Sequence, residues 1–103
     1  MEKKMTYRTV FEPARDEMIE KKSRFIGSVR PVTTEQEAVD FINSCRAEFR
    51  DATHNVYAYI VQENNISRYS DDGEPSGTAG RPILDIILGM EIHNVCVVVS
   101  LQV

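Results

Sequence analysis

Cysteine is scarce in this sequence of 103 residues, which contains only Cys45 and Cys96. Two cysteines are too few for the disulfide framework of a small secreted domain, and both are expected to be reduced because the chain has no export signal. Residues 1–6 lack the apolar stretch of a signal peptide, and no apolar run approaches the roughly 20 residues that span a bilayer. Internal repeats and low-complexity tracts are absent as well. These absences predict a single cytoplasmic domain without a membrane segment.

The composition is that of an ordinary globular protein, with 42% hydrophobic and 27% charged residues, which excludes wholesale disorder. The charge, however, is unevenly distributed along the chain. Residues 1–30 hold eight basic and five acidic residues, whereas residues 31–103 hold four basic and eleven acidic residues. This distribution excludes a uniformly basic nucleic-acid-binding protein and leaves a local basic surface in the first third.

The first third of the chain is typical of β-strands. Candidate strands cover residues 7–11, 17–22 and 24–30. In the last of these, Phe25, Gly27 and Val29 fall on one face because side chains alternate along a strand. Pro31 is expected to close this strand.

Two helices are predicted further along the chain. The first begins with a capping box at Thr34 and Glu37 and extends over residues 34–50, with Cys45 on its apolar stripe. The second begins near Pro82, since a proline suits the first turn of a helix. Its apolar residues recur at helical spacing and are expected to face the core; they are Ile83, Ile86, Ile87 and Met90.

Three more strands complete the pattern, over residues 55–61, 66–70 and 94–100. The last is so rich in valine that we expect it to be buried on both faces, in the centre of the sheet. The order of strands, helix, strands, helix and strand predicts an α+β domain. In this domain a mostly antiparallel sheet carries both helices packed on one face.

Residues 71–80, with the sequence Asp-Asp-Gly-Glu-Pro-Ser-Gly-Thr-Ala-Gly, are the main candidate binding loop. The second half precedes a helix, where glycines let backbone N–H groups approach an anion. The candidate anion-binding residues are Ser76, Gly77, Thr78 and Gly80. The first half is acidic, and Asp71, Asp72 and Glu74 are candidates to hold Mg²⁺. The structural alternative is a rigid turn whose carboxylates accept backbone N–H bonds and cap the helix.

Two residues outside this loop are also candidates for ligand binding. His54 directly precedes the strand over residues 55–61 and suits a general base or a hydrogen-bond donor to phosphate. The alternative for His54 is a hydrogen bond to the local backbone. Arg24 belongs to a basic strand edge with Lys21 and Lys22, which suits RNA phosphates or, alternatively, protects the edge of the sheet. The histidines and cysteines lack the spacing of a zinc site.

Three segments together resemble the IMPACT family, whose bacterial members are called YigZ-like. These segments are residues 22–26 (Lys-Ser-Arg-Phe-Ile), residues 52–59 (Ala-Thr-His-Asn-Val-Tyr-Ala-Tyr) and, most specifically, residues 71–80 followed by Pro82. The resemblance covers about residues 6–99 and implies a fold like domain 2 of ribosomal protein S5. It also implies a role related to translation, because eukaryotic relatives regulate translation and ribosome or nucleic-acid association is proposed for bacterial members by fold analogy.

The resemblance ends after the valine-rich strand. Members of the family continue with Thr-Arg-Tyr-Phe-Gly-Gly, whereas residues 97–103 read Val-Val-Val-Ser-Leu-Gln-Val. We therefore expect residues 1–103 to form a single truncated N-terminal domain whose sheet lacks a covering helix. Such a domain should self-associate through its uncovered apolar surface.

Three hypotheses for function come from these segments. The first is a non-enzymatic, translation-related domain without a cofactor, which contacts RNA or a ribosome-associated protein through Arg24 and residues 71–80. The second is a metal-assisted hydrolase or phosphotransferase, in which the acidic residues of the loop hold Mg²⁺ and His54 acts as the base. The third is an inactive fragment.

Overall fold

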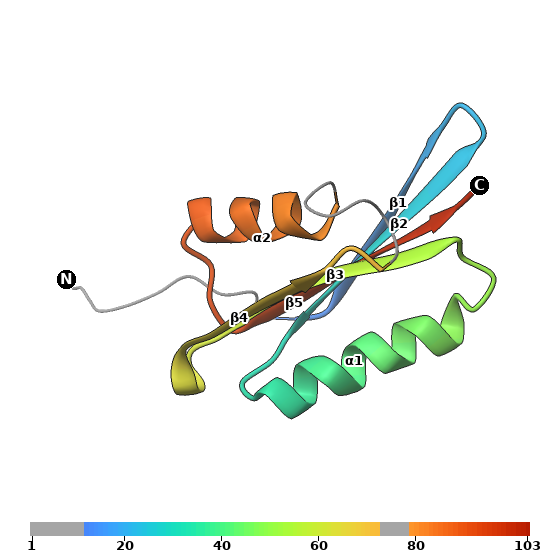
Figure 1. Ribbon diagram of the computed structural model, residues 1–103. Coiled ribbons are helices and arrows are strands. Elements are labelled where there is room, and N and C mark those ends of the chain that lie inside the picture. Colours follow the sequence, from blue (N-terminus) through green and yellow to red (C-terminus); the bar gives the residue numbers. More distant parts are fainter. Residues whose placement is uncertain (1–11, 73–78) are drawn as a thin grey trace.

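The computed structural model describes residues 12–72 and 79–103. Five strands and two α-helices form the fold (Figure 1). In chain order they are β1 (Ala14–Glu20), β2 (Ser23–Pro31), α1 (Glu35–Glu48), β3 (His54–Val61), β4 (Ile66–Ser70), α2 (Gly80–Gly89) and β5 (Val95–Gln102), with a short 3-10 turn (Glu63–Asn65) before β4. The predicted strands over residues 17–30, 55–61, 66–70 and 94–100 are confirmed with shifted ends. The predicted strand over residues 7–11 lies outside the described residues.

The strands form one antiparallel sheet in the order β1-β2-β5-β3-β4. β1 and β2 make a hairpin that turns at Lys21 and Lys22, where Lys21 takes the left-handed conformation with φ of 58°. β5 lies in the centre and pairs with β2 on one side and β3 on the other. The α+β class, the antiparallel sheet and the central position of the last strand are therefore confirmed.

The two helices lie on opposite faces of the sheet (Figure 1), so the expectation that both pack on one face was wrong. The reason is that β3 is apolar at consecutive positions. Tyr59 and Val61 point to the α1 side, whereas Ala58 and Ile60 point to the α2 side. A strand that is apolar on both sides needs cover on both, and each helix supplies one layer.

Helix α1 begins as predicted, with Thr34 as its N-cap. The Thr34 hydroxyl accepts a hydrogen bond from the Glu37 backbone N–H at 3.1 Å, and the Glu37 carboxylate accepts from the Thr33 backbone N–H at 2.7 Å. This backbone hydrogen bond holds the pKa of Glu37 below its usual value. The apolar stripe that includes Cys45 is buried against the sheet, as predicted.

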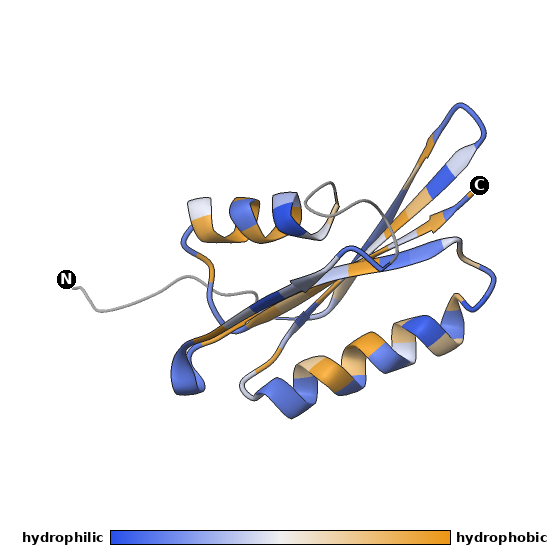
Figure 2. Cartoon of the chain, in the orientation of Figure 1, coloured by the Kyte–Doolittle hydropathy of each residue, from blue (hydrophilic) through white to orange (hydrophobic). Residues whose placement is uncertain are grey.

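Helix α2 buries only part of the predicted stripe. Ile87 and Ile83 pack in the core beside Leu84, as predicted for the first two. The prediction was wrong for Ile86, which is 62% exposed, and for Met90, which is 49% exposed. The helix begins at Gly80 rather than at Pro82, and Gly80 packs directly against the backbone of Ser70. This contact holds the start of α2 against β4, and Ile86 and Met90 lie on the part of the helix surface that is turned away from the sheet. The alternating polar and apolar segments of both helices can be followed in Figure 2.

No helix within residues 12–72 and 79–103 is long and apolar enough to cross a membrane.

Candidate functional site

The candidate site is the corner where β4 leads into α2, and its first described residue, Asp71, caps the helix. One carboxylate oxygen, Oδ1, accepts hydrogen bonds from the backbone N–H groups of Ala79 at 3.2 Å and Gly80 at 2.6 Å. Both N–H groups belong to the start of α2 and have no acceptor within the helix. Asp71 therefore occupies the position that a bound anion would take, and the Gly80 N–H is already used.

The second acidic residue, Asp72, is equally engaged with its own chain. Its Oδ2 accepts from the Asn55 backbone N–H at 2.5 Å, and its Oδ1 accepts from the Arg46 guanidinium at 3.4 Å. The backbone is in the left-handed region, with φ of 49°. The Asp72 carbonyl lies 2.7 Å from His54 Nδ1. Because a carbonyl can only accept, a hydrogen bond in this contact requires a proton on Nδ1.

A buried hydrogen bond continues this network into the sheet. The Ser100 hydroxyl donates to the Asn55 side-chain oxygen at 2.6 Å, and the two residues are 0% and 8% exposed. The network therefore joins the β4–α2 corner to β3 and β5. Sequence reasoning missed Asn55 and Ser100, although a polar residue inside an otherwise apolar strand is a usable signal for a buried hydrogen bond.

Asp71 caps α2, as in the structural alternative, whereas Asp72 accepts a backbone hydrogen bond from β3 rather than from the helix. His54 likewise bonds the local backbone. Among the described residues no group of three or more His, Cys, Asp or Glu side chains is placed to hold a metal ion. The predicted roles of Glu74, Ser76, Gly77 and Thr78 concern residues outside the described ranges, so ligand binding and Mg²⁺ binding by this loop remain predictions.

An apolar hollow of about 230 Å³ adjoins the corner, on the α2 side of the sheet. It is lined by Phe25, His54, Val56, Ala79, Ile83, Val99 and Leu101. His54 is the one polar side chain in this lining. Such a lining suits contact with an apolar group, because it offers no set of converging polar groups.

Arg24 lies on the opposite face from His54 and does not converge with the corner. Its Nε donates to Glu17 Oε2 at 2.6 Å, and its Nη1 donates to Gln102 Oε1 at 2.9 Å. The hydrogen bond to Glu17 raises the pKa of Arg24, and the same bond lowers the pKa of Glu17. The Arg24 donors are thus shared between the strands on either side of β2. Because β2 is paired on both sides, Arg24 does not protect an edge of the sheet, and the edge-protecting alternative was wrong for this residue.

Arginine pairing is general on the described surface. Five of the seven arginines in the described ranges form ion pairs with N···O distances between 2.6 and 3.4 Å. The pairs are Arg15 with Glu48, Arg24 with Glu17, Arg46 with Asp72, Arg68 with Glu35 and Arg81 with Asp85. Cations that are already paired contribute less to phosphate binding.

Comparison with known proteins agrees with this architecture. Residues 21–101 match the model of the Impact N-terminal domain. The chain is 44% identical over 96 residues to the IMPACT family member YvyE of Bacillus subtilis, which covers 92% of this chain and 44% of YvyE. It is 39% identical over 82 residues to the IMPACT family member YigZ of Escherichia coli, which covers 77% of this chain and 40% of YigZ.

Solved structures agree as well. The crystal structure of a hypothetical protein superposes with a TM-score of 0.83 at 34% identity, covering 89% of this chain and 46% of the other. The two-domain translational regulator Yih1 superposes with a TM-score of 0.64 at 29% identity, covering 88% of this chain and 35% of Yih1. The chain therefore spans less than half the length of these relatives. On the match of residues 21–101 and on these identities, the chain belongs to the IMPACT family.

Proposed function

We propose that this chain is a translation-related binding domain and that its ligand is a ribosome-associated protein. Family membership and the similarity to the translational regulator Yih1 support a role related to translation. The observation that carries the proposal is that the polar side chains at the candidate corner form hydrogen bonds with the protein's own backbone. Asp71, Asp72 and His54 all bond their own chain, which supports a binding role over a catalytic one for these three residues.

The charge of the described surface favours a protein over RNA. Residues 12–30, the described part of the basic first third, hold five basic and four acidic residues. Two of the five, Arg15 and Arg24, are ion-paired. Sequence-independent RNA binding depends on cations that neutralise phosphates, and this surface offers few of them.

The β1–β2 hairpin is the contact surface that we propose. It extends beyond the body of the domain (Figure 1), and β1 is exposed along its whole length. Within residues 12–72 and 79–103, β1 is also the edge strand of the sheet, and the side turned away from β2 can pair with an extended segment of a partner. The exposed Lys21 and Lys22 at its tip add local charge that would orient an acidic segment of that partner.

Binding to ribosomes tests the proposal directly. The chain should sediment with ribosomes purified at low salt and should be absent from ribosomes stripped of associated proteins by a high-salt wash. Adding the wash fraction back should restore sedimentation. A K21E/K22E double variant should lose roughly tenfold in retention, comparable to the loss of an important contact at an interface. The matched control is Arg50→Glu, an exposed charge reversal after α1 and away from the hairpin.

Two results would contradict the proposal. One is equal retention on stripped ribosomes, and the other is equal retention of the K21E/K22E variant. Fluorescence anisotropy with short single-stranded RNA, measured over a series of salt concentrations, tests whether the ligand is RNA rather than a protein. Saturable RNA binding that weakens steeply with salt would replace the protein ligand by RNA.

A further inference from the structure

Arg15 lies near the start of β1 and reaches across the neighbouring strand to helix α1. Its Nε donates a hydrogen bond to the Ser28 hydroxyl on β2 at 2.9 Å. Its Nη1 donates to Glu48 Oε2 at 2.6 Å, and its guanidinium carbon lies 4.8 Å from the centre of the Phe49 ring. One side chain therefore joins β1, β2 and the C-terminal end of α1.

The other side-chain hydrogen bonds of β1 stay within the β1–β2 hairpin, as far as residues 12–72 and 79–103 show. Asp16 accepts from the Glu17 backbone N–H, and Glu17 accepts from Arg24 on β2. In the sheet β1 pairs with β2, whereas α1 packs mainly over β5 and β3. Within the described part of the chain, Arg15 is thus the side chain that bonds β1 to α1.

Two hollows lie between β1 and α1, and Arg15 lines both of them. One has a volume of about 360 Å³ and is also lined by Glu17 on β1 and Glu48 on α1. The other has a volume of about 290 Å³ and is also lined by Ala14 on β1 and Phe41 on α1. Because described side chains leave these spaces unfilled, the position of β1 relative to α1 depends on the contacts that Arg15 makes.

The same side chain lies against a buried thiol. Cys45 on α1 is 1% exposed and interacts with both the Ser28 hydroxyl and the Arg15 guanidinium. Burial raises the pKa of Cys45, and the positive charge of Arg15 opposes this rise. The accessibility of Cys45 therefore reports whether Arg15 is in place.

We propose that the Arg15 side chain acts as a latch, which positions β1 against the end of α1 and can open without unfolding of the core. An ion pair, a hydrogen bond and a cation–π contact converge on its guanidinium. At exposed sites each contact changes an equilibrium by a few-fold, so together they favour the closed latch by roughly tenfold or more. The Arg15 and Glu48 side chains are 40% and 52% exposed, so water replaces their contacts when the latch opens.

The latch also affects the proposed contact surface, and this part of the inference rests on the proposed function. A partner segment that pairs along β1 needs that strand to be held in one position, because ordering a mobile strand during binding costs affinity. Opening of the latch lowers the fraction of molecules that are ready to bind, and the apparent affinity falls by the same factor. Arg15 is therefore a positioning residue, since its guanidinium contacts α1 and acts on the partner only through β1.

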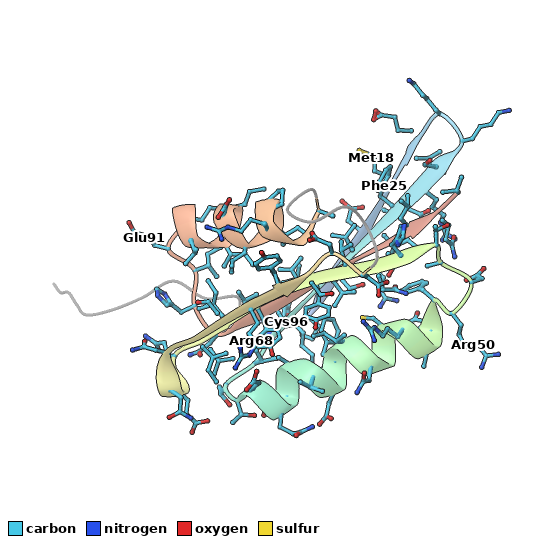
Figure 3. The ribbon with its side chains drawn as sticks, in the orientation of Figure 1. Met18, Phe25, Arg50, Arg68, Glu91 and Cys96 are labelled. Carbon is cyan, nitrogen blue, oxygen red and sulfur yellow. The ribbon has the colours of Figure 1, made fainter. Side chains whose placement is uncertain are left out.

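Alkylation of the two native cysteines by iodoacetamide, measured by mass spectrometry, tests the latch. Cys96 is 0% exposed on β5, between the sheet and α1 (Figure 3), and reports opening of the whole core. Arg15→Met keeps most of the side-chain length but lacks the guanidinium. In this variant the ratio of the Cys45 rate to the Cys96 rate should rise roughly tenfold. Loss of the positive charge alone would raise the pKa of Cys45 and slow its reaction, so a faster reaction reports opening.

The matched control is Arg24→Met. Arg24 lies on the same face of the sheet and its side chain is similarly exposed, but its ion pair with Glu17 stays within the hairpin. The ratio of the two rates should remain that of the wild type. An unchanged ratio in Arg15→Met would overturn the latch, and so would an equal rise in both variants.

Ribosome sedimentation tests the positioning role with Glu48→Ala, because Glu48 lies on α1 and not on the hairpin. Retention should fall roughly threefold, as expected for the loss of one exposed ion pair. Asp85→Ala, which removes an exposed ion pair with Arg81 on α2, should be retained like the wild type. Equal retention of Glu48→Ala and the wild type would refute the positioning role. If the wild-type chain itself does not sediment, the proposed function fails, and the alkylation ratio still decides whether Arg15 is a latch.

Discussion

Replacing Gly80 by alanine should destabilise the domain, because the backbone of Ser70 fills the space that the new methyl group would need. A Cβ at Gly80 would lie 2.7 Å from the Ser70 carbonyl carbon, 3.0 Å from its nitrogen and closer still to its oxygen. A shift of roughly 1 Å would be needed to restore van der Waals separation. Backbone atoms cannot rotate away, so α2 would have to move off β4, and the hydrogen bond from the Gly80 N–H to Asp71 would lengthen.

Overpacking of this kind lowers the free energy of unfolding by about 1–3 kcal/mol. Because the hydrogen bond that caps the helix is weakened as well, we expect Gly80→Ala to lose about 2 kcal/mol or more. A loss of about 2 kcal/mol lowers the Tm of a domain this size by roughly 10 °C. Urea unfolding followed by circular dichroism measures the difference. Gly27→Ala is the matched control, because its Cβ would have open space and alanine is less costly than glycine in a strand by up to about 1 kcal/mol. Equal stability of Gly80→Ala and the wild type, or equal losses in both variants, would refute the close contact.

Three further changes test other contacts. Ser100→Ala should cost about 1–2 kcal/mol, because it leaves the buried Asn55 side-chain oxygen without its donor, and urea unfolding measures this loss. Tyr59→Phe removes the hydroxyl that donates to Glu35 at 2.6 Å, so the pKa of Glu35, which this bond holds below its usual value, should rise in an NMR titration. The depressed pKa values of Glu35 and Glu37 stabilise the folded state at neutral pH. The urea midpoint should therefore fall as the pH drops below about 4.5, and a midpoint independent of pH would contradict these bonds.

The elements that sequence reasoning predicted well are those with local signals. The start of α1 follows from a cap and a carboxylate three residues apart, and both lie in one turn of the chain. The strands follow from runs of β-branched and aromatic residues bounded by turns. These signals depend only on residues within the segment and not on what packs against it. The elements that they predict are therefore the ones that the structure confirms.

The side of the sheet that each helix covers was not predicted, although part of the signal was present. Residues 56–61 are apolar without alternation, and such a strand requires cover on both faces. The orientation of α2 had no local signal. It depends on the contact between Gly80 and Ser70 and on the cap by Asp71, and these join residues nine and ten positions apart through the loop.

The candidate site shows the same limit. The sequence singled out Asp71 and Asp72 as candidate ligand-binding residues, but the spacing of residues did not predict which groups of the chain bond to them. Asp72 meets Asn55 across 17 positions, and Arg24 meets Glu17 only through the register of the hairpin. The hydrogen bonds of a carboxylate thus depend on tertiary neighbours, and ligand binding by these two residues stays a prediction.

The central position of β5 has a consequence for how the domain folds. β1 with β2 and β3 with β4 are hairpins whose strands are close in sequence, so each can form early from local contacts. The two hairpins are joined in the sheet through β5, which pairs with both. Residues 95–102 must therefore insert between two partly ordered halves in the step that unites them. During synthesis, both halves leave the ribosome before this strand does and must wait with unpaired edges until it arrives.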